Sequence, residues 1–237
     1  MPSKRTYGDP CGIARALDLI GERWALLVVR ELVLGPKRFT DLRTGLPNLS
    51  PDVLAQRLRD LEEAGIVRRR TLPPPAAARV YELTGWGREL EPVLLALGRW
   101  GSRAPFPPGE AELGVDALIV ALQTTFDPAA ADRQAATYEL RLGGQTFTAR
   151  VAEGRLEVAR GTPEDPDAVI ETDPATLTAV LWHGHWRAEA ERDGAMTISG
   201  SRAAAGRFLQ LFPAPTPAPT PSRAPVPARP ARGPAGS

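Results

Sequence analysis

Side chains suited to reading base pairs lie on one face of the segment that spans residues 50–65. At about 100° per residue, Gln56 and Arg59 share this outer face with Asp52 and Glu63. A glutamine amide can bond two polar groups of an adenine edge, and a guanidinium can bond guanine or a phosphate. Asp52 either stabilises the positive end of the helix or accepts a hydrogen bond from a cytosine amino group. The pattern therefore predicts a helix that contacts DNA bases.

The residues around this face carry the signals of a helix with one buried side. Ser50 is a favourable N-cap, Pro51 suits the first helical position, and Gly65 supplies a stop. Three leucines recur at i, i+4 and i+7 and form the buried stripe: Leu54, Leu58 and Leu61. The helix is thus expected to present its polar face outward.

Positive side chains before and after this helix are expected to neutralise phosphates. A β-like run at 66–71 contains three consecutive arginines, and a returning strand at 80–84 completes a hairpin, the wing, with 73–78 as its tip. Arg57, near the core edge of the helix, is expected to meet a phosphate or a structural carboxylate. The full set of expected DNA contacts is Lys37, Arg38, Ser50, Asp52, Gln56, Arg57, Arg59, Arg68, Arg69, Arg70 and Arg79. The alternative for the arginines is a solvated surface of salt bridges beside Asp60, Glu62 and Glu63.

Helical spacing predicts further helices around the wing, at 11–20, 24–34 and 39–44. Thr84 is expected to cap one last helix that runs to about residue 100. The apolar side of that helix consists of Leu90, Val93, Leu94, Leu97 and Trp100. This surface is larger than a small domain can cover, so we expect it to form a dimer interface with the first helix. The alternative is that residues 105–212 pack over it.

Four stretches together resemble the HxlR family of bacterial transcription regulators: C-G-I-A-R-A-L-D-L-I-G-E-R-W-A-L-L-V-V-R-E-L, G-P-K-R-F-T-D-L, L-S-P-D-V-L-A-Q-R-L-R-D-L-E-E-A-G-I-V and Y-E-L-T-G-W-G-R-E-L. The likeness covers residues 8–103 almost continuously. It implies a dimeric winged-helix protein that binds double-stranded DNA through the helix at 50–64 and the wing. It also implies that Cys11 holds the position that oxidant-sensing members use.

Cys11 is the one cysteine, so the chain can form no internal disulfide, and a reducing, cytoplasmic compartment is expected. A thiol near a helix N-terminus, with Lys4, Arg5 and Arg15 close in sequence, favours the thiolate. Cys11 is a candidate redox sensor that would pair between subunits or take a small-molecule cap. The alternative is a small buried hydrophobic residue at the start of a helix.

Charge divides the chain into parts, although the formal net charge of the whole is +1. Residues 1–104 hold 17 Lys and Arg against 12 Asp and Glu, whereas residues 105–212 hold 9 against 16. The segment 213–237 is rich in proline and alanine and holds three arginines and no acid. We expect a basic DNA-binding domain at 1–104, a linker at 105–112, an acidic domain at 113–212 and a disordered tail at 213–237.

The acidic part has the pattern of an α+β domain. Strict alternation over 138–142 and 147–151, on either side of Gly143 and Gly144, predicts a hairpin. The other expected elements are helices at 115–126, 174–182 and 201–212 and strands at 156–158, 168–173 and 196–198. Together they predict an antiparallel sheet with helices packed against it.

Two segments of this domain, A-V-I-E-T-D-P-A-T-L-T-A-V-L-W and M-T-I-S-G-S-R-A-A-A-G-R-F-L-Q-L-F, resemble the sterol carrier protein fold over residues 113–212. In that fold a sheet and helices enclose an apolar tunnel, so the resemblance implies a chamber for an apolar small-molecule effector. The candidate lining residues are Leu118, Leu122, Phe126, Leu177, Leu181, Trp182, Phe208 and Phe212. The alternative for each of them is an ordinary place in the core.

No catalytic, cofactor or metal site is expected. The sequence has no nucleophile–base pair, phosphate loop or dinucleotide fingerprint in a credible setting, and His183 and His185 lack a third metal ligand. No run is long and apolar enough for a membrane helix. The sequence therefore predicts a cytoplasmic, homodimeric transcription regulator controlled by an apolar effector. Two alternatives are a lipid-binding or transfer protein that dimerises through its winged helix, and a regulator whose acidic domain is a protein-interaction module.

Overall fold

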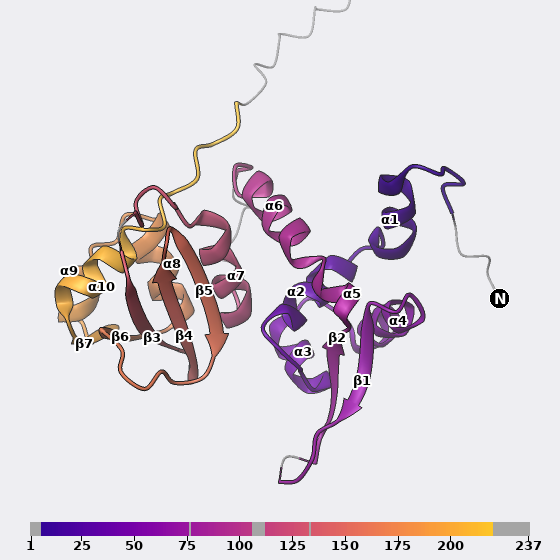
Figure 1. Ribbon diagram of the computed structural model, residues 1–237, viewed down its shortest axis with the longest axis horizontal. Coiled ribbons are helices and arrows are strands. Elements are labelled where there is room, and N and C mark those ends of the chain that lie inside the picture. Colours follow the sequence, from indigo (N-terminus) through magenta and orange to yellow (C-terminus); the bar gives the residue numbers. More distant parts are fainter. Residues whose placement is uncertain (1–5, 76, 106–111, 133, 220–237) are drawn as a thin grey trace, which may run out of the picture.

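The computed structural model describes residues 6–75, 77–105, 112–132 and 134–219. Within these residues the first half, up to residue 105, holds helices and a two-stranded wing. The second half, from residue 112 on, holds a five-stranded sheet with helices (Figure 1). The elements of the first half are α1 (Gly12–Ile20), α2 (Ala25–Val33), α3 (Phe39–Gly45), α4 (Pro51–Glu63), β1 (Val67–Thr71), β2 (Arg79–Leu83), α5 (Gly85–Arg88) and α6 (Glu91–Gly101).

The helix expected to contact DNA is α4, and its local structure matches the expectation. The Ser50 hydroxyl accepts a hydrogen bond from the backbone N–H of Val53 at 3.4 Å and so caps the helix. Past its end, Gly65 has a φ of +70°, which glycine adopts without a Cβ penalty. The three leucines of the predicted stripe are at most 1% exposed. They anchor α4 in the core of the first half.

The expectation of one continuous last helix is wrong. Thr84 caps a helix as expected, accepting a hydrogen bond from the N–H of Gly87 at 3.0 Å, but that helix is the short α5. A second helix, α6, begins at Glu91 with Pro92 in its first turn. A proline is harmless there, whereas inside a continuous helix its ring would clash with the carbonyl of Arg88. The chain therefore breaks between α5 and α6.

The second half begins with α7 (Val115–Thr125), which leads into the sheet. Its strands are β3 (Ala136–Leu142), β4 (Gln145–Ala152), β5 (Arg155–Arg160), β6 (Ala168–Thr172) and β7 (Met196–Gly200). Its other helices are α8 (Pro174–Trp182), α9 (Arg187–Arg192) and α10 (Arg202–Leu209). The strand order in the sheet is β5-β4-β3-β6-β7.

The sheet is mixed, so the expectation of an antiparallel sheet is wrong for one strand pair. β3 and β4 pair antiparallel around Gly143 and Gly144, whose φ angles of +55° and +78° fit the expected tight turn. β6, however, lies parallel to β3, with Ala168 opposite Tyr138. Residues 161–167 carry the chain from β5 at one edge to the far side of β3. Alternation along a strand marks the two faces of a sheet and not the order of its strands.

Helix α7 lies between the two halves of the molecule (Figure 1). It contacts α2, α3 and α6 of the first half and α8 of the second. Its own buried residues lie on more than one side of the helix and include Asp116, Val120 and Thr124. The eight candidate lining residues all belong to one hydrophobic cluster between the sheet and its helices. This cluster is the core of the second half.

Residues 106–111 of the expected linker and 220–237 of the expected tail lie outside the described residues. The described start of the tail lies beside the end of α6. There Arg103 Nε donates to the Thr216 carbonyl at 3.2 Å, and the Ala218 N–H donates to the Arg103 carbonyl at 2.8 Å. In the part of the chain that the structure describes, no helix combines the length and the apolar character that crossing a bilayer requires.

Candidate nucleic-acid interface

Helix α4 exposes the side chains expected to meet DNA bases. Asp52, Gln56 and Arg59 are all exposed, on the side opposite the buried leucines. Arg59 Nη2 donates to the Gln56 amide oxygen at 2.6 Å, and the Gln56 amide nitrogen donates to Asp60 at 2.8 Å. These contacts hold an amide and a guanidinium side by side at the surface. Such a pair offers the donors and acceptors that major-groove recognition uses.

Val53 belongs to the same face, although the residue pattern had not marked it. Its side chain is 40% exposed, one turn before Gln56. An exposed aliphatic side chain at this place can contact the methyl group of thymine. The sequence feature that could have marked Val53 is its apolar side chain at a position outside the leucine stripe of the helix.

Arg57 and Ser50 support α4 in this structure. The Arg57 guanidinium lies 3.3 Å from Glu22 and 3.1 Å from Asp60, and its side chain is 15% exposed. Of the two expected partners for Arg57, the structure shows the structural carboxylates. Ser50 uses its hydroxyl as the helix cap. Both residues therefore hold α4 and its exposed face in place.

Two of the wing arginines share one carboxylate. Arg68 and Arg70 project from the same side of β1 and lie 2.7 and 3.3 Å from the oxygens of Glu82. The side chains of the arginines are about half exposed, whereas that of Glu82 is 8% exposed. Arg79, beside the wing tip, is exposed, and its side chain has no ion pair within the described residues. The wing therefore combines paired and unpaired cations.

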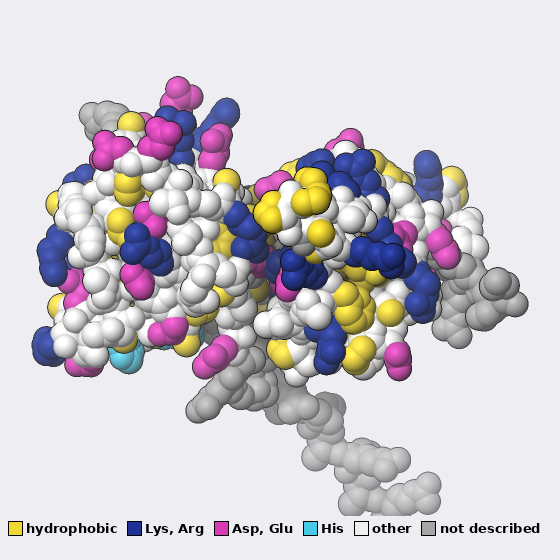
Figure 2. All heavy atoms as spheres, turned by 90° about the horizontal axis from the view of Figure 1, so that it is seen from below, with side chains coloured by type: hydrophobic (Ala, Val, Ile, Leu, Met, Phe, Trp, Pro, Cys, Tyr) yellow, Lys and Arg dark blue, Asp and Glu magenta, His cyan; other side chains and the backbone are white. Residues whose placement is uncertain are grey.

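The third arginine of β1 connects the wing to α4. Arg69 lies 2.9 Å from Glu62 of α4 and 5.3 Å above the ring of Tyr81. Figure 2 views the molecule from the side toward which the wing points in Figure 1. On the winged-helix half, Lys and Arg side chains gather around the wing tip. A basic surface with one protruding hairpin suits the phosphates on either side of a groove.

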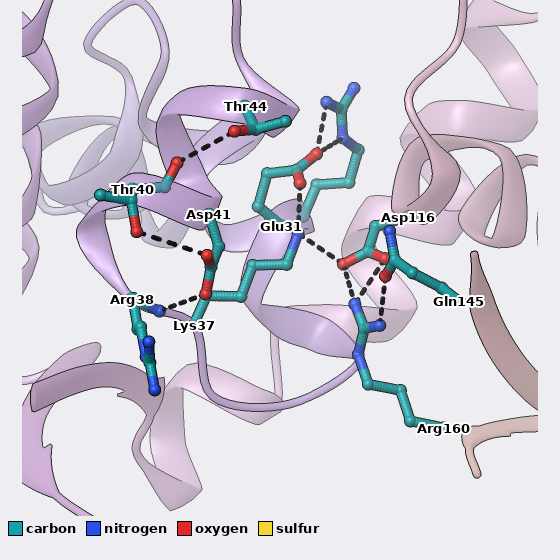
Figure 3. A network of polar contacts seen from close by, with 10 residues as sticks. Glu31, Lys37, Arg38, Thr40, Asp41, Thr44, Asp116, Gln145 and Arg160 are labelled. Carbon is teal, nitrogen blue, oxygen red and sulfur yellow. Dashed lines mark hydrogen bonds and ion pairs between the residues drawn. The ribbon is translucent and has the colours of Figure 1, made fainter. Parts of the chain in front are cut away.

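Lys37 and Arg38 are neighbours in sequence with different surroundings (Figure 3). Lys37 Nζ lies 2.6 Å from oxygens of both Glu31 and Asp116, and its side chain is 12% exposed. Arg38 is exposed, and its backbone N–H donates to Asp41 at 3.0 Å at the start of α3. The structure thus places Lys37 between the two halves, whereas a surface contact with DNA was expected. Arg38 remains accessible.

The two acids that hold Lys37 were not expected from the sequence. Glu31 is 1% exposed and Asp116 is 3% exposed. Gly45 makes room for the first, because a Cβ at that position would lie 2.2 Å from a Glu31 carboxylate oxygen. The available signal was a single acidic residue in a mostly apolar helical segment, which describes both positions.

The one cysteine is exposed, so the alternative of a small buried hydrophobic residue is wrong. Cys11 immediately precedes α1, and its backbone N–H donates to Asp9 at 2.8 Å. Its thiol is therefore accessible to oxidants and electrophiles. No group of three or more His, Cys, Asp and Glu side chains that could hold a metal ion occurs within the described residues.

An exposed helix face beside a basic hairpin defines a winged helix-turn-helix, a class of DNA-binding protein. The model of the HxlR-like helix-turn-helix family matches residues 19–106. The HTH-type transcriptional regulator YvaP of Bacillus subtilis is 38% identical over 88 residues, which cover 37% of this chain and 82% of the relative. The regulator sll1512 of Synechocystis sp. is 41% identical over 95 residues, which cover 40% of this chain and 70% of the relative. The chain belongs to the HxlR-like helix-turn-helix family of DNA-binding transcriptional regulators.

A solved structure, the reduced form of the transcriptional regulator YodB from B. subtilis, is 35% identical to this chain. It covers 42% of this chain and 98% of its own, with a TM-score of 0.36. The family model ends at residue 106, so family membership concerns the first half. The resemblance of residues 113–212 to the sterol carrier proteins stays a prediction.

Proposed function

We propose that this regulator binds a near-palindromic operator as a homodimer and that α4 reads its base pairs. The observation that carries the proposal is the exposed face of α4, where Gln56 and Arg59 lie together beside the arginines of the wing. In the major groove Gln56 would bond adenine, Arg59 would bond guanine, and Val53 would meet a thymine methyl. Bidentate contacts of this kind discriminate between bases, whereas phosphate contacts do not.

The exposed cations around α4 are proposed to contact phosphates. Arg38 lies at the start of α3, and Arg79 lies beside the wing tip. The three arginines of β1 keep about half of their side-chain surface exposed while paired with acids of the protein. Phosphate contacts release bound counterions, so affinity is expected to fall steeply with salt. Lys37 and Arg57 are left out of this set because they are paired with carboxylates and their side chains are only 12% and 15% exposed.

An exposed apolar surface supports the dimer. Ile13 and Leu17 on α1 and Val93, Leu97 and Trp100 on α6 are between 43% and 74% exposed. The second half contacts α6 through α7 but leaves these side chains uncovered. Both helices lie away from the wing in Figure 1. A second copy related by a two-fold axis would cover this surface and carry a second α4 to the other half-site.

The second half is proposed to bind an apolar small molecule that alters DNA affinity. Two buried polar atoms beside its apolar cluster, Tyr138 Oη and Trp182 Nε1, have no hydrogen-bond partner within the described residues. Burial raises the pKa of the Tyr138 hydroxyl, outweighing the opposing charge of Arg207, so the group stays protonated. A mainly apolar ligand with a polar group would satisfy such an atom. Control of DNA binding requires that the ligand prefer either the DNA-free or the DNA-bound state.

Selection of genomic DNA fragments by the purified chain tests the proposal. Fluorescence anisotropy on a recovered fragment and its scrambled version is expected to show a clear preference, with two protomers per site by light scattering. Equal, weak binding to both sequences would overturn the proposal and favour the lipid-binding alternative. Native mass spectrometry tests the effector site separately: a co-purified apolar ligand supports it, and a repeatedly empty protein contradicts it.

A further inference from the structure

A chain of ion pairs joins the winged-helix half to the sheet (Figure 3). Glu31 of α2 and Asp116 of α7 hold the Lys37 ammonium between them, each at 2.6 Å. Beyond Asp116, Arg160 at the end of β5 donates to both carboxylate oxygens at 2.5 and 2.6 Å. The same guanidinium donates to the Gln145 amide oxygen of β4 at 2.6 Å. Charge thus alternates along this chain, from Glu31 through Lys37 and Asp116 to Arg160.

The centre of this chain is shielded from water. The side chains of Glu31 and Asp116 are each 2% exposed. Buried charges are stable only when paired, and removal of the Asp116 charge leaves Lys37 with Glu31 alone, an acid that also pairs with Arg30 at 2.8 Å. Asp116 also lies in the first turn of α7, where the positive end of the helix favours a carboxylate. The position of the Lys37 ammonium is therefore held from both halves.

Lys37 also holds the wing through its main chain. Its N–H donates to the Tyr81 carbonyl at 3.0 Å, and the Tyr81 N–H donates to the Lys37 carbonyl at 2.8 Å. Tyr81 is the middle residue of β2 and lies opposite Arg69 of β1. The next residue along the chain, Arg38, leads into α3. One residue thereby connects the buried ion pairs, the wing and the helix that precedes α4.

We propose that Lys37 is a positioning residue for DNA binding. The Asp116–Arg160 pair of the sheet half holds its ammonium, and its main chain in turn sets the wing and the start of α3 relative to α4. The inference rests on the proposed function, because it explains how the second half takes part in reading DNA. It makes the sheet half a structural part of the DNA-binding unit. A ligand that moves Arg160 or Asp116 would then change DNA affinity without touching DNA.

The test compares Asp116→Asn with Glu139→Gln in the full chain. Glu139 is a matched control, because it is a 4% exposed carboxylate of the same half whose ion-pair partner, Arg141, lies in that half too. Both substitutions remove one buried negative charge, so they change the net charge of the chain equally. The readouts are affinity for the selected operator and the amide exchange rates of Lys37 and Tyr81.

We expect Asp116→Asn to weaken operator binding by about fivefold or more, in the range of typical coupling between sites, and to speed exchange at both amides. Glu139→Gln is expected to change neither, and Asp116→Glu, which keeps the charge, to restore much of the binding. Arg160→Gln serves as a milder second variant if Asp116→Asn unfolds, and it is expected to act in the same direction.

Amide exchange in the Asp116→Asn variant that matches that of Glu139→Gln would overturn the inference, whatever the affinities are. This readout needs no DNA. If the wild-type chain selects no operator, the proposed function fails, while the exchange rates still decide whether the second half holds the wing through Lys37.

Discussion

Replacement of Arg79 by alanine tests the phosphate contacts of the wing. Arg79 is exposed and has no ion pair within the described residues, so its loss removes a positive charge without freeing a buried carboxylate. Each phosphate contact adds about 0.9 to the slope of log K against log salt, so a dimer that loses two contacts loses about 1.8. The affinity of the wild type therefore falls faster with salt than that of the variant. Between about 50 and about 200 mM salt, the ratio of the two affinities falls by about twelvefold.

The assay is fluorescence anisotropy on the selected operator over a salt series. Arg150→Ala is the matched control, because Arg150 is an exposed arginine of β4 in the other half, and its loss changes the net charge equally. We predict a reduced slope for Arg79→Ala and an unchanged slope for Arg150→Ala. Equal slopes in the two variants would refute the proposed wing contact.

Four further predictions follow from the same structure. Leu58→Ala, at a fully buried position in α4, is expected to lower the free energy of unfolding of the first half by about 2–5 kcal/mol, measured by denaturant titration; a loss near zero would contradict the packing. Trp100→Asp on α6 is expected to give a folded monomer by light scattering and circular dichroism, with a melting temperature that no longer depends on protein concentration, and a persistent dimer would exclude this surface. Asp173→Ala removes the N-cap of α8 and is expected to lower the free energy of unfolding by about 0.5–2 kcal/mol in the same denaturant titration. Burial raises the pKa of the Asp173 carboxyl, but hydrogen bonds from Thr176 and nearby amides outweigh it and lower that pKa. The loss of unfolding free energy in Asp173→Ala is therefore complete at neutral pH. It shrinks as the pH falls below about 3.9, the pKa of an unperturbed aspartate, towards the lower pKa of Asp173 in the folded protein, and a pH-independent loss would argue against the ionised cap. Cys11→Ser is expected to abolish any loss of operator binding caused by diamide or a quinone, and a variant that still responds would show that the thiol is not the sensor.

Local features of the fold could be predicted from the sequence because their causes lie within a few residues. The cap at Ser50, the leucine stripe of α4, the cap at Thr84 and the turn at Gly143 and Gly144 all have such local causes. The break before α6 also has a local cause, Pro92, although the spacing of the apolar residues predicted one continuous helix. The spacing of apolar residues indicates which side of a helix is buried, whereas a proline limits where the helix can continue.

Features that depend on docking could not be predicted in this way. The parallel pairing of β3 and β6 depends on the path of the chain around the sheet. The place of Lys37 depends on Asp116 and Arg160, which are distant in sequence and approach it only because α7 packs on α2 and α3. A lysine in a basic run is most often a surface residue, and only the tertiary contact makes this one a buried partner of two acids. The outward face of α4 was predictable, and so was Glu62 as an acid beside the wing arginines, whereas the pairing of Arg68 and Arg70 with Glu82 was not.

The most direct test of base reading by α4 is a comparison of wild type with Gln56→Ala/Arg59→Ala on the selected operator and on operators with single base pairs changed. We predict that the double variant loses about 1–3 kcal/mol of discrimination for each bidentate contact removed, while its salt-dependent binding to unrelated DNA stays. A double variant that keeps the full preference of the wild type would contradict the assignment of α4 as the recognition helix.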